Sequence, residues 1–238
     1  MNRVVIHQPS YLPWIGLFDR IAQADLFIVY DNVQYDKHGW RNRNRIKTAA
    51  GSQWLTVPIL TKHRSGMLVS DALVNPQVPW SRKHLQAIRV NYARAPHLDR
   101  YVKPLAEILD RPWTHLMDLD LTLQDFLFDA LGMRVQQMKA TALGDTSAPS
   151  ASERLAILCQ RAGATEYISP DAAKDYLDPR PLEAAGVTVR FHGYQHPVYP
   201  QLHGPFIPHL SVIDLLMNCG EQSLATLTHR APSAVTAP

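Results

Sequence analysis

The chain has 238 residues, of which 46% are apolar and 19% charged, so it can bury a core in one large domain or two small ones. Its formal net charge is +3, too small for the global field alone to indicate nucleic-acid binding. It contains two cysteines, no apolar run long enough to cross a bilayer and no recognisable signal peptide. These features predict a cytoplasmic protein with free thiols and no membrane partner, and they argue against disulfide-rich and membrane-spanning classes.

The start of the chain predicts a strand, a loop and a helix. Residues 4–6 are apolar and β-branched, as in a buried strand, and a polar turn with two prolines separates them from an apolar helical pattern at residues 17–21. In open α/β sheets, ligands bind beyond the carboxyl ends of the strands. The first site candidates are therefore His7, Gln8 and Tyr11.

A second buried strand is predicted at residues 26–30, and Asp31 follows at its carboxyl end. A strand–helix–strand unit of this length is a right-handed crossover between parallel strands, so we expect His7 and Asp31 on the same edge of the sheet. A histidine oriented by a carboxylate can act as a general base, which makes both residues candidate catalytic groups. The alternative is that His7 is a hydrogen-bonded structural residue of the turn.

Residues 31–47 form a long polar and aromatic segment, and long loops of this kind are usually functional or disordered. Basic residues alternate with amides in its second half, so an extended backbone would place guanidinium groups on one face and amides on the other. This pattern predicts an anion site, because guanidinium groups bind phosphate and carboxylate in bidentate fashion. A solvated edge strand and a nucleic-acid contact are the alternatives. The substrate-binding candidates here are Gln34, Tyr35, Trp40, Arg41, Asn42, Arg43 and Asn44.

The middle of the chain predicts two short strands and then a helical layer. Apolar residues recur there with the spacing of amphipathic helices, and Gly132 closes the last of them. The predicted segments are strands at residues 54–59 and 67–74, and helices at about 80–92, 98–109 and 116–131. We interpret the helices as an insertion over about residues 80–132.

Strand and helix patterns alternate again in the last third. Ser152 is predicted to cap a helix that ends at Gly163, and residues 133–138, 166–169 and 187–191 read as strands. Alternation in both halves predicts an α/β fold with a mostly parallel sheet.

A second polar and aromatic segment covers residues 191–209. We expect it to meet the first segment beside the tip of the opening strand. Its substrate-binding candidates are His196, Tyr199 and Gln201. Ser211 then caps a helix, and Asp214 at the third helical position is interpreted as part of a capping box.

The expected organisation is a single α/β domain over residues 1–220. A short helix and a frayed tail are expected over residues 221–238, because the last residues lack apolar content.

Several chemistries find no support. Four of the eleven histidines lie at positions 192, 196, 203 and 209, but the prolines between them and the lack of a helical period argue against a metal centre, and no metal ligands are predicted. The chain has no G-x-S-x-G, no P-loop and no G-x-G-x-x-G motif, which argues against serine-hydrolase, Walker-type and dinucleotide chemistry.

Motifs at both ends of the chain are distinctive when taken together. The opening reads His7-Gln8-Pro9-x-Tyr11-Leu12-Pro13-Trp14-x-Gly16-x-Phe18-Asp19, followed by Asp31-x-Val33-Gln34-Tyr35 and Gly39-Trp40-Arg41-Asn42-Arg43-Asn44. Later come Tyr194-x-His196-Pro197-x-Tyr199-x-Gln201 and Leu210-Ser211-Val212-Ile213-Asp214. This set resembles the WbqC-like family over nearly the whole of residues 1–220. The chain departs from this family at Pro170, a position where its members often carry glycine.

The resemblance implies a transferase of bacterial surface-polysaccharide synthesis, such as that of O-antigen or capsule, which moves an acyl or aminoacyl group onto an amino sugar. On this basis we expect a nucleotide-linked amino sugar as the small-molecule partner. No tightly bound cofactor is expected. The co-substrate would be a thioester of coenzyme A or of carrier-protein phosphopantetheine, and an acyl carrier protein is the expected protein partner.

The expected roles combine this resemblance with the residue chemistry. His7 would deprotonate the sugar amine with Asp31 orienting its ring, and Gln8 or Asn42 would stabilise the oxyanion. Arg41 and Arg43 would bind the diphosphate. The aromatic residues expected to stack on a sugar or base are Trp14, Tyr35 and Trp40.

The opening also has a distant likeness to the nucleotidyltransferases of the HUP class, which begin with a strand, a histidine-containing loop, a helix and a strand. This likeness predicts a HUP-like N-terminal half. The second histidine of an H-x-G-H pair and a K-M-S-K-S-like loop are both absent. Nucleotidyl or adenylyl transfer is one alternative function, and non-catalytic binding of a sugar nucleotide or nucleic acid is the other.

Overall fold

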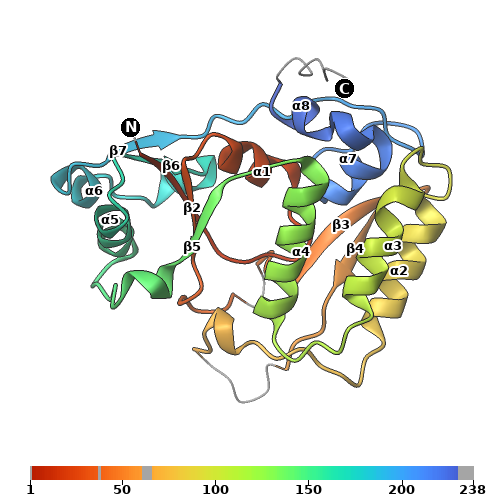
Figure 1. The fold of residues 1–238 in the computed structure, drawn as a ribbon, viewed down its shortest axis with the longest axis horizontal. Helices are drawn as coiled ribbons and strands as arrows, with labels where there is room; N and C mark the ends of the chain where they lie inside the picture. The colour runs from red at the N-terminus through yellow and green to blue at the C-terminus, as the bar shows by residue number, and fades with distance from the viewer. Residues whose placement is uncertain (1, 37–38, 61–65, 230–238) are drawn as a thin grey trace, which may run out of the picture.

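The computed structural model describes residues 2–36, 39–60 and 66–229. Its centre is a five-stranded sheet with the spatial order β5-β2-β1-β6-β7, in which all neighbouring strands are parallel (Figure 1). The strands are β1 (Arg3–His7), β2 (Leu26–Val29), β5 (Gln136–Lys139), β6 (Glu166–Ser169) and β7 (Thr188–Phe191). The predicted α/β fold with a mostly parallel sheet is confirmed.

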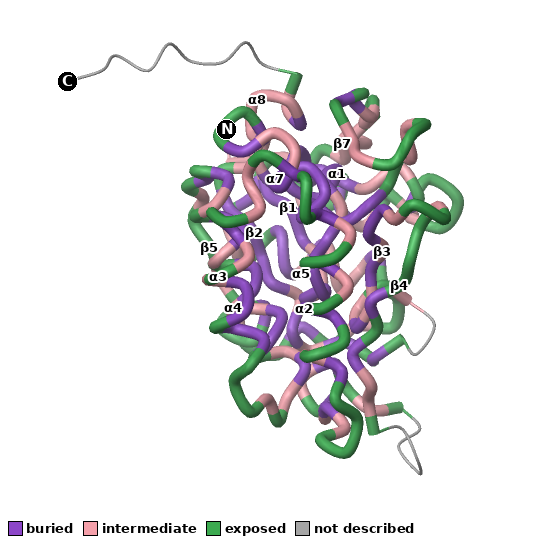
Figure 2. The backbone as a smooth tube through the Cα atoms, turned by 90° about the vertical axis from the view of Figure 1, so that its right-hand side faces the viewer, coloured by how far each residue is buried: buried purple, intermediate pink, exposed green. Residues whose placement is uncertain are grey.

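Helices cover both faces of the sheet, because the central strands carry apolar side chains on both faces. Val4 and Ile6 of β1 pack with α5 and α6, whereas Val5 packs with α1 and α4. Figure 1 shows these two helix pairs on opposite sides of the strands. The helices are α1 (Ile15–Ala22), α4 (Leu116–Leu131), α5 (Ala151–Arg161) and α6 (Arg180–Ala184). In Figure 2, β1 and β2 accordingly run through the interior as buried segments.

The strand order reverses direction between β1 and β6. From β1 the chain builds outward to β2 and β5, and it then returns to the other side of β1 to add β6 and β7. This is the order 3-2-1-4-5 of doubly wound sheets, whose ligands bind beyond the carboxyl ends of the strands at the reversal point. His7 and Ser169, the last residues of β1 and β6, mark that point here.

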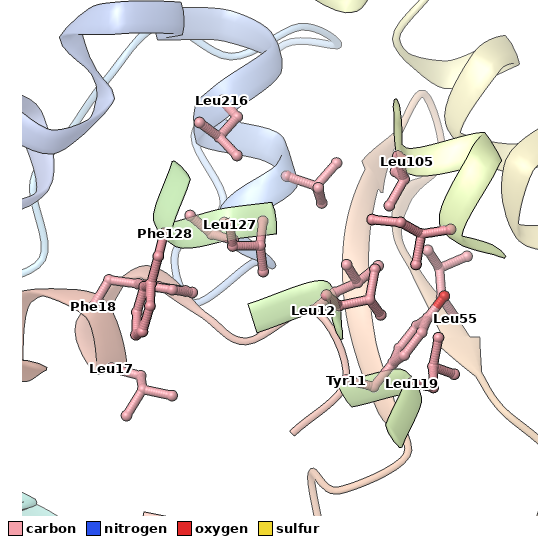
Figure 3. Close-up of a cluster of buried hydrophobic side chains, with 14 of the residues drawn as sticks. Tyr11, Leu12, Leu17, Phe18, Leu55, Leu105, Leu119, Leu127, Phe128 and Leu216 are labelled. Atoms are coloured by element: carbon pink, nitrogen blue, oxygen red, sulfur yellow. The ribbon is translucent and has the colours of Figure 1, made fainter. Parts of the chain in front are cut away.

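The connection from β2 to β5 carries a second layer. It contains the antiparallel hairpin β3 (Arg43–Thr48) and β4 (Gly51–Thr56), followed by α2 (Trp80–Asn91), α3 (Leu98–Leu109) and α4. The hairpin packs on α2, and the core between these elements and α1 gathers leucines and aromatic rings (Figure 3). The three predicted amphipathic helices are therefore confirmed.

Two local predictions were wrong. Residues 67–74 do not form a strand: they contain the short 3-10 helix η1 (Val69–Asp71) and single bridges to Gln34, Ile59 and His115, so no ladder develops. The helix α5 is capped by Ser150, two residues before the expected position. Ser150 and Glu153 form a complete capping box, and the Ser152 hydroxyl instead accepts a hydrogen bond from the Asp178 N–H.

Ser211 caps α7 (Val212–Cys219) as predicted, but Asp214 has another role. Its buried carboxylate accepts hydrogen bonds from the hydroxyls of Tyr92 and Tyr199, at 2.7 and 2.8 Å. Burial raises the pKa of Asp214, while both hydroxyls and Lys47 oppose that rise. The interpretation of Asp214 as a capping residue was wrong, because its partners are tyrosines of distant segments.

Segments from both ends of the chain meet beside the sheet edge. The Tyr11 N–H donates to the Arg41 carbonyl, and the Val212 N–H donates to the Pro13 carbonyl. The Ser211 N–H donates to the carbonyl of Arg45 in β3. The loop after β1 is thus held between the hairpin and the start of α7. Within residues 2–36, 39–60 and 66–229, no helix combines the length and the apolar character needed to cross a bilayer.

Candidate functional site

His7 lies at the carboxyl end of β1, and its ring is held by an arginine of α1. The Arg20 Nη2 is 3.1 Å from the His7 Nδ1. Arg20 is only 3% exposed although it is charged, because the apolar face of α1 carries it against the sheet. A guanidinium can only donate, so the His7 Nδ1 must accept and the ring proton of neutral His7 resides on Nε2.

Charge and burial keep His7 neutral. Burial lowers the pKa of His7 well below its ordinary value, and the nearby Arg41 and Arg20 lower it further. A neutral ring whose Nδ1 is occupied presents an N–H, not a lone pair, at Nε2. The geometry therefore favours His7 as a hydrogen-bond donor, and the role of general base that the sequence suggested has no support in it.

Arg41 reaches the same strand end from the start of the hairpin. Its Nη1 donates to the Gln8 carbonyl at 3.2 Å. Two buried polar atoms nearby, the Arg20 Nη1 and the Gln8 Oε1, have no hydrogen-bond partner in the described part of the chain. We call His7, Gln8, Arg20 and Arg41 the β1-edge cluster. Buried donors and acceptors that lack partners are costly in a folded protein unless a ligand or ordered water satisfies them.

Asp120 of α4 is the acidic residue with the largest influence on the pKa of Arg41. Its side chain is buried, and neither carboxyl oxygen has a hydrogen-bond partner among the described residues. Burial raises the pKa of Asp120 well above its ordinary value, and Arg41 opposes that rise. The same setting raises the pKa of Tyr35 to about 12, first through burial and then through Asp120.

Asp31 lies on the predicted edge but does not contact His7. Its two carboxylate oxygens accept from the N–H and the hydroxyl of Thr141, at 3.0 and 2.6 Å. It thereby joins the end of β2 to η2 (Ala140–Leu143), which follows β5. Arg20 occupies the position that Asp31 was expected to take against the His7 ring, so that pairing was wrong.

Three further candidates are structural. Tyr11 is fully buried, and its hydroxyl is 2.9 Å from the Nδ1 of His84, so it lies in the core and not at the edge (Figure 3). Asn42 donates to the Val57 carbonyl, and Asn44 donates to the Leu12 carbonyl at 2.8 Å. Asn44 matters indirectly, because Leu12 has a positive φ of 43° and this bond holds the strained turn after β1.

The aromatic candidates divide into two places. The Trp14 indole packs on Tyr194 and His209 and lies over Gly16, where any Cβ would collide with the ring. Trp40 is exposed just before the hairpin, with its ring centroid 5.1 Å from that of Trp54 of β4.

Arg43 belongs to the hairpin surface and not to the β1-edge cluster. Its guanidinium lies 4.7 Å from the centre of the Trp54 ring, a cation–π contact. Gln34 is exposed and forms one bridge to Leu68. The structure thus gives Arg41 and Arg43 different surroundings, and their joint binding of one diphosphate stays a prediction.

The candidates of the second polar segment, residues 191–209, mainly form hydrogen bonds that stabilise this segment. His196 accepts the His209 N–H at Nε2 and faces the Pro197 carbonyl with Nδ1, so both ring nitrogens are used. Gln201 bonds both backbone groups of Ile207. Tyr199 is bound to Asp214 as described above. None of the three side chains contacts the β1-edge cluster.

Sequence reasoning missed Arg20, Asp120 and a pair formed by Asp19 and His192. The His192 Nε2 lies 2.6 Å from the Asp19 Oδ2, and both side chains are nearly buried. The available signal was the run 17–21, where two charged residues interrupt the apolar face of a helix that must pack on a sheet. In the part of the chain that the structure covers, no three His, Cys, Asp or Glu side chains gather as a metal centre would need.

The fold and the site define a doubly wound α/β protein with a cluster of buried donor groups at the reversal point of its sheet. Comparison with known families then gives the particular family. The profile of the WbqC-like protein family matches residues 8–226, and the chain belongs to this family.

One relative is the uncharacterized protein Rv1507c of Mycobacterium tuberculosis (strain ATCC 25618 / H37Rv). It is 39% identical over 225 residues, which cover 94% of this chain and 96% of the relative. No solved structure matches the chain.

Proposed function

We propose that this protein is a cytoplasmic transferase that moves an acyl or aminoacyl group onto the amine of a nucleotide-linked amino sugar, in the synthesis of a bacterial surface polysaccharide. The observation that supports it is the β1-edge cluster. Two guanidinium groups and one ring N–H meet at the reversal point of the sheet, and one of these donors is buried without a partner. Such a donor set suits the oxygens of a phosphate group.

In this proposal Arg20 and Arg41 bind the phosphate of the sugar nucleotide, and His7 donates its Nε2–H to the same group. The amine nitrogen attacks the carbonyl carbon of a thioester of coenzyme A or of carrier-protein phosphopantetheine. A C–N bond forms and the C–S bond breaks, and the sulfur leaves as a thiol that takes up the proton lost by the amine. The binding of the phosphate supplies positioning, which is worth several kcal/mol of the barrier when the reacting atoms are well aligned.

The test combines binding and transfer. The protein is titrated calorimetrically with nucleotide-linked amino sugars and then incubated with each of them plus acyl thioesters, with mass spectrometry of the sugar and detection of free thiol. Arg20→Gln and Arg41→Gln should each weaken binding and lower transfer by at least about tenfold, as expected for the loss of a charged hydrogen-bond donor. Arg89→Gln, an exposed arginine of α2, is the matched control and should change neither.

Two results would contradict the proposal. One is the absence of both binding and transfer with every sugar nucleotide tested. The other is release of pyrophosphate from a nucleoside triphosphate by the protein alone, which would favour a nucleotidyltransferase instead.

A further inference from the structure

Asp19 and His192 form a second histidine pair beside the β1-edge cluster. Asp19 lies on α1, and His192 follows the last residue of β7. Besides the 2.6 Å contact with His192, the Asp19 Oδ2 accepts from the Gln23 side chain at 2.9 Å. The His192 ring also stacks on Tyr194, with centroids 5.3 Å apart and planes within 13°. The ring orientation is therefore fixed from two directions.

The contact with Asp19 fixes which nitrogen of neutral His192 carries the proton. A carboxylate can only accept, so the His192 Nε2 donates and the Nδ1 has a free lone pair. No hydrogen bond from a described residue reaches this Nδ1. His7 has the opposite arrangement, because Arg20 occupies its Nδ1 and leaves an N–H at Nε2. In their neutral forms, one ring thus offers an acceptor and the other a donor.

Consecutive residues of one helix hold the two rings on the same side of the sheet. Asp19 binds the ring at the end of β7, and Arg20 binds the ring at the end of β1. Only β6 separates these strands, so their ends are two strand spacings apart, about 10 Å. The end at β1 is cationic and rich in donors, whereas the end at β7 is an acceptor with a carboxylate behind it.

We propose that this edge of the sheet is a bipolar site that selects a phosphate ester carrying an amine, with the phosphate at the β1-edge cluster and the amine at the His192 Nδ1. The inference rests on the proposed function and deepens it, because it assigns the discrimination between amino sugars and ordinary sugars to His192. An amine, protonated or neutral, can donate to the Nδ1, whereas the hydroxyl of an ordinary sugar is the weaker donor. His192 is then the specificity-determining residue and Asp19 its positioning residue.

The experiment compares two sugar phosphates that differ in one group. Glucosamine 1-phosphate, glucose 1-phosphate and inorganic phosphate are titrated calorimetrically into the protein near neutral pH. The unmodified protein should bind glucosamine 1-phosphate at least about tenfold more tightly than glucose 1-phosphate, as expected for one hydrogen bond to a charged group. His192→Phe keeps a ring to stack on Tyr194 but removes the acceptor, so it should bind both sugar phosphates equally.

Controls separate this inference from the proposed function. His115→Phe, at a partly exposed histidine that pairs with Asp118 and contacts neither His7 nor His192 in the described residues, should keep the preference of the unmodified protein. If His192→Phe does not fold, histidine ring nitrogen NMR of the unmodified protein replaces it, and glucosamine 1-phosphate should shift the His192 Nδ1 signal whereas inorganic phosphate should not. Equal binding of both sugar phosphates, or a preference that survives in His192→Phe, overturns the inference alone. Failure of all three phosphates to bind also overturns the inference, and the titration and transfer assay with nucleotide-linked amino sugars then decides the proposed function separately.

Discussion

At the scale of single residues, the contact between Arg20 and His7 decides what the histidine can do. The residue type and its position at the end of a strand suggested a base. In the fold, the cationic Arg20 donates to the Nδ1 of His7, so the neutral ring can donate a hydrogen bond only from its Nε2–H. A side chain that could serve as acid, base, ligand or donor is thus restricted to one role by a neighbour thirteen residues away.

This restriction predicts a change in titration. Because Arg20 is one of the causes that lower the pKa of His7, Arg20→Gln should raise that pKa toward its ordinary value, although burial still opposes protonation. Histidine ring titration by NMR measures it, with Arg89→Gln as the control that leaves the pKa unchanged. An unaltered His7 titration in Arg20→Gln would show that the cation does not set the state of the ring.

At the scale of elements, the sequence was most informative where a period runs for several turns or a strand is wholly apolar. β1, β2 and helices α2, α3 and α4 were all predictable for this reason. The segment 67–74 was not, because its apolar residues pair singly with loops. The cap of α5 was missed although its signal was present, since Ser150 and Glu153 have the spacing of a capping box.

That cap gives a prediction about stability. Ser150→Ala removes the hydroxyl that accepts the Glu153 N–H and should lower the free energy of unfolding by about 1 kcal/mol. Urea denaturation followed by circular dichroism measures the change. Ser147→Ala, an exposed serine of the preceding loop, is the matched control. A loss no larger than that of the control would mean that the cap does not stabilise α5.

At the scale of the whole molecule, the topology explains which part of the site was predictable. Parallel strands end at one edge, so the sequence could place His7 and Asp31 there. It could not show that Asp31 binds Thr141 or that His192 binds Asp19, because these partners lie 110 and 173 residues apart. Such contacts depend on side-chain packing after the layers have assembled. The enzyme activity, the thioester and the carrier-protein partner stay predictions.

Global stability should depend on pH through His84. Burial lowers the pKa of His84 to about 4, so the folded protein protonates this ring at a lower pH than the unfolded chain, which does so near pH 6.5. Neutral His84 contributes its full stabilisation above the pKa of the unfolded chain, near 6.5. As the pH falls from there toward 4, the free energy of unfolding decreases by on the order of 3 kcal/mol. Chemical denaturation at several pH values should show that the stability difference between the unmodified protein and His84→Gln shrinks over this interval. A constant difference would contradict it.

The pairing of β1 with β6 also has a consequence during synthesis of the chain. Arg3 pairs with Glu166, so about 160 residues must follow the opening strand before this neighbour exists. At roughly 5–20 residues per second, a ribosome needs on the order of 10–30 s for that length. Throughout this interval one hydrogen-bonding edge of a strongly apolar strand has no native partner, which invites association with other nascent chains. Nascent chains stalled before residue 166 should therefore depend on chaperones more than those stalled after residue 191.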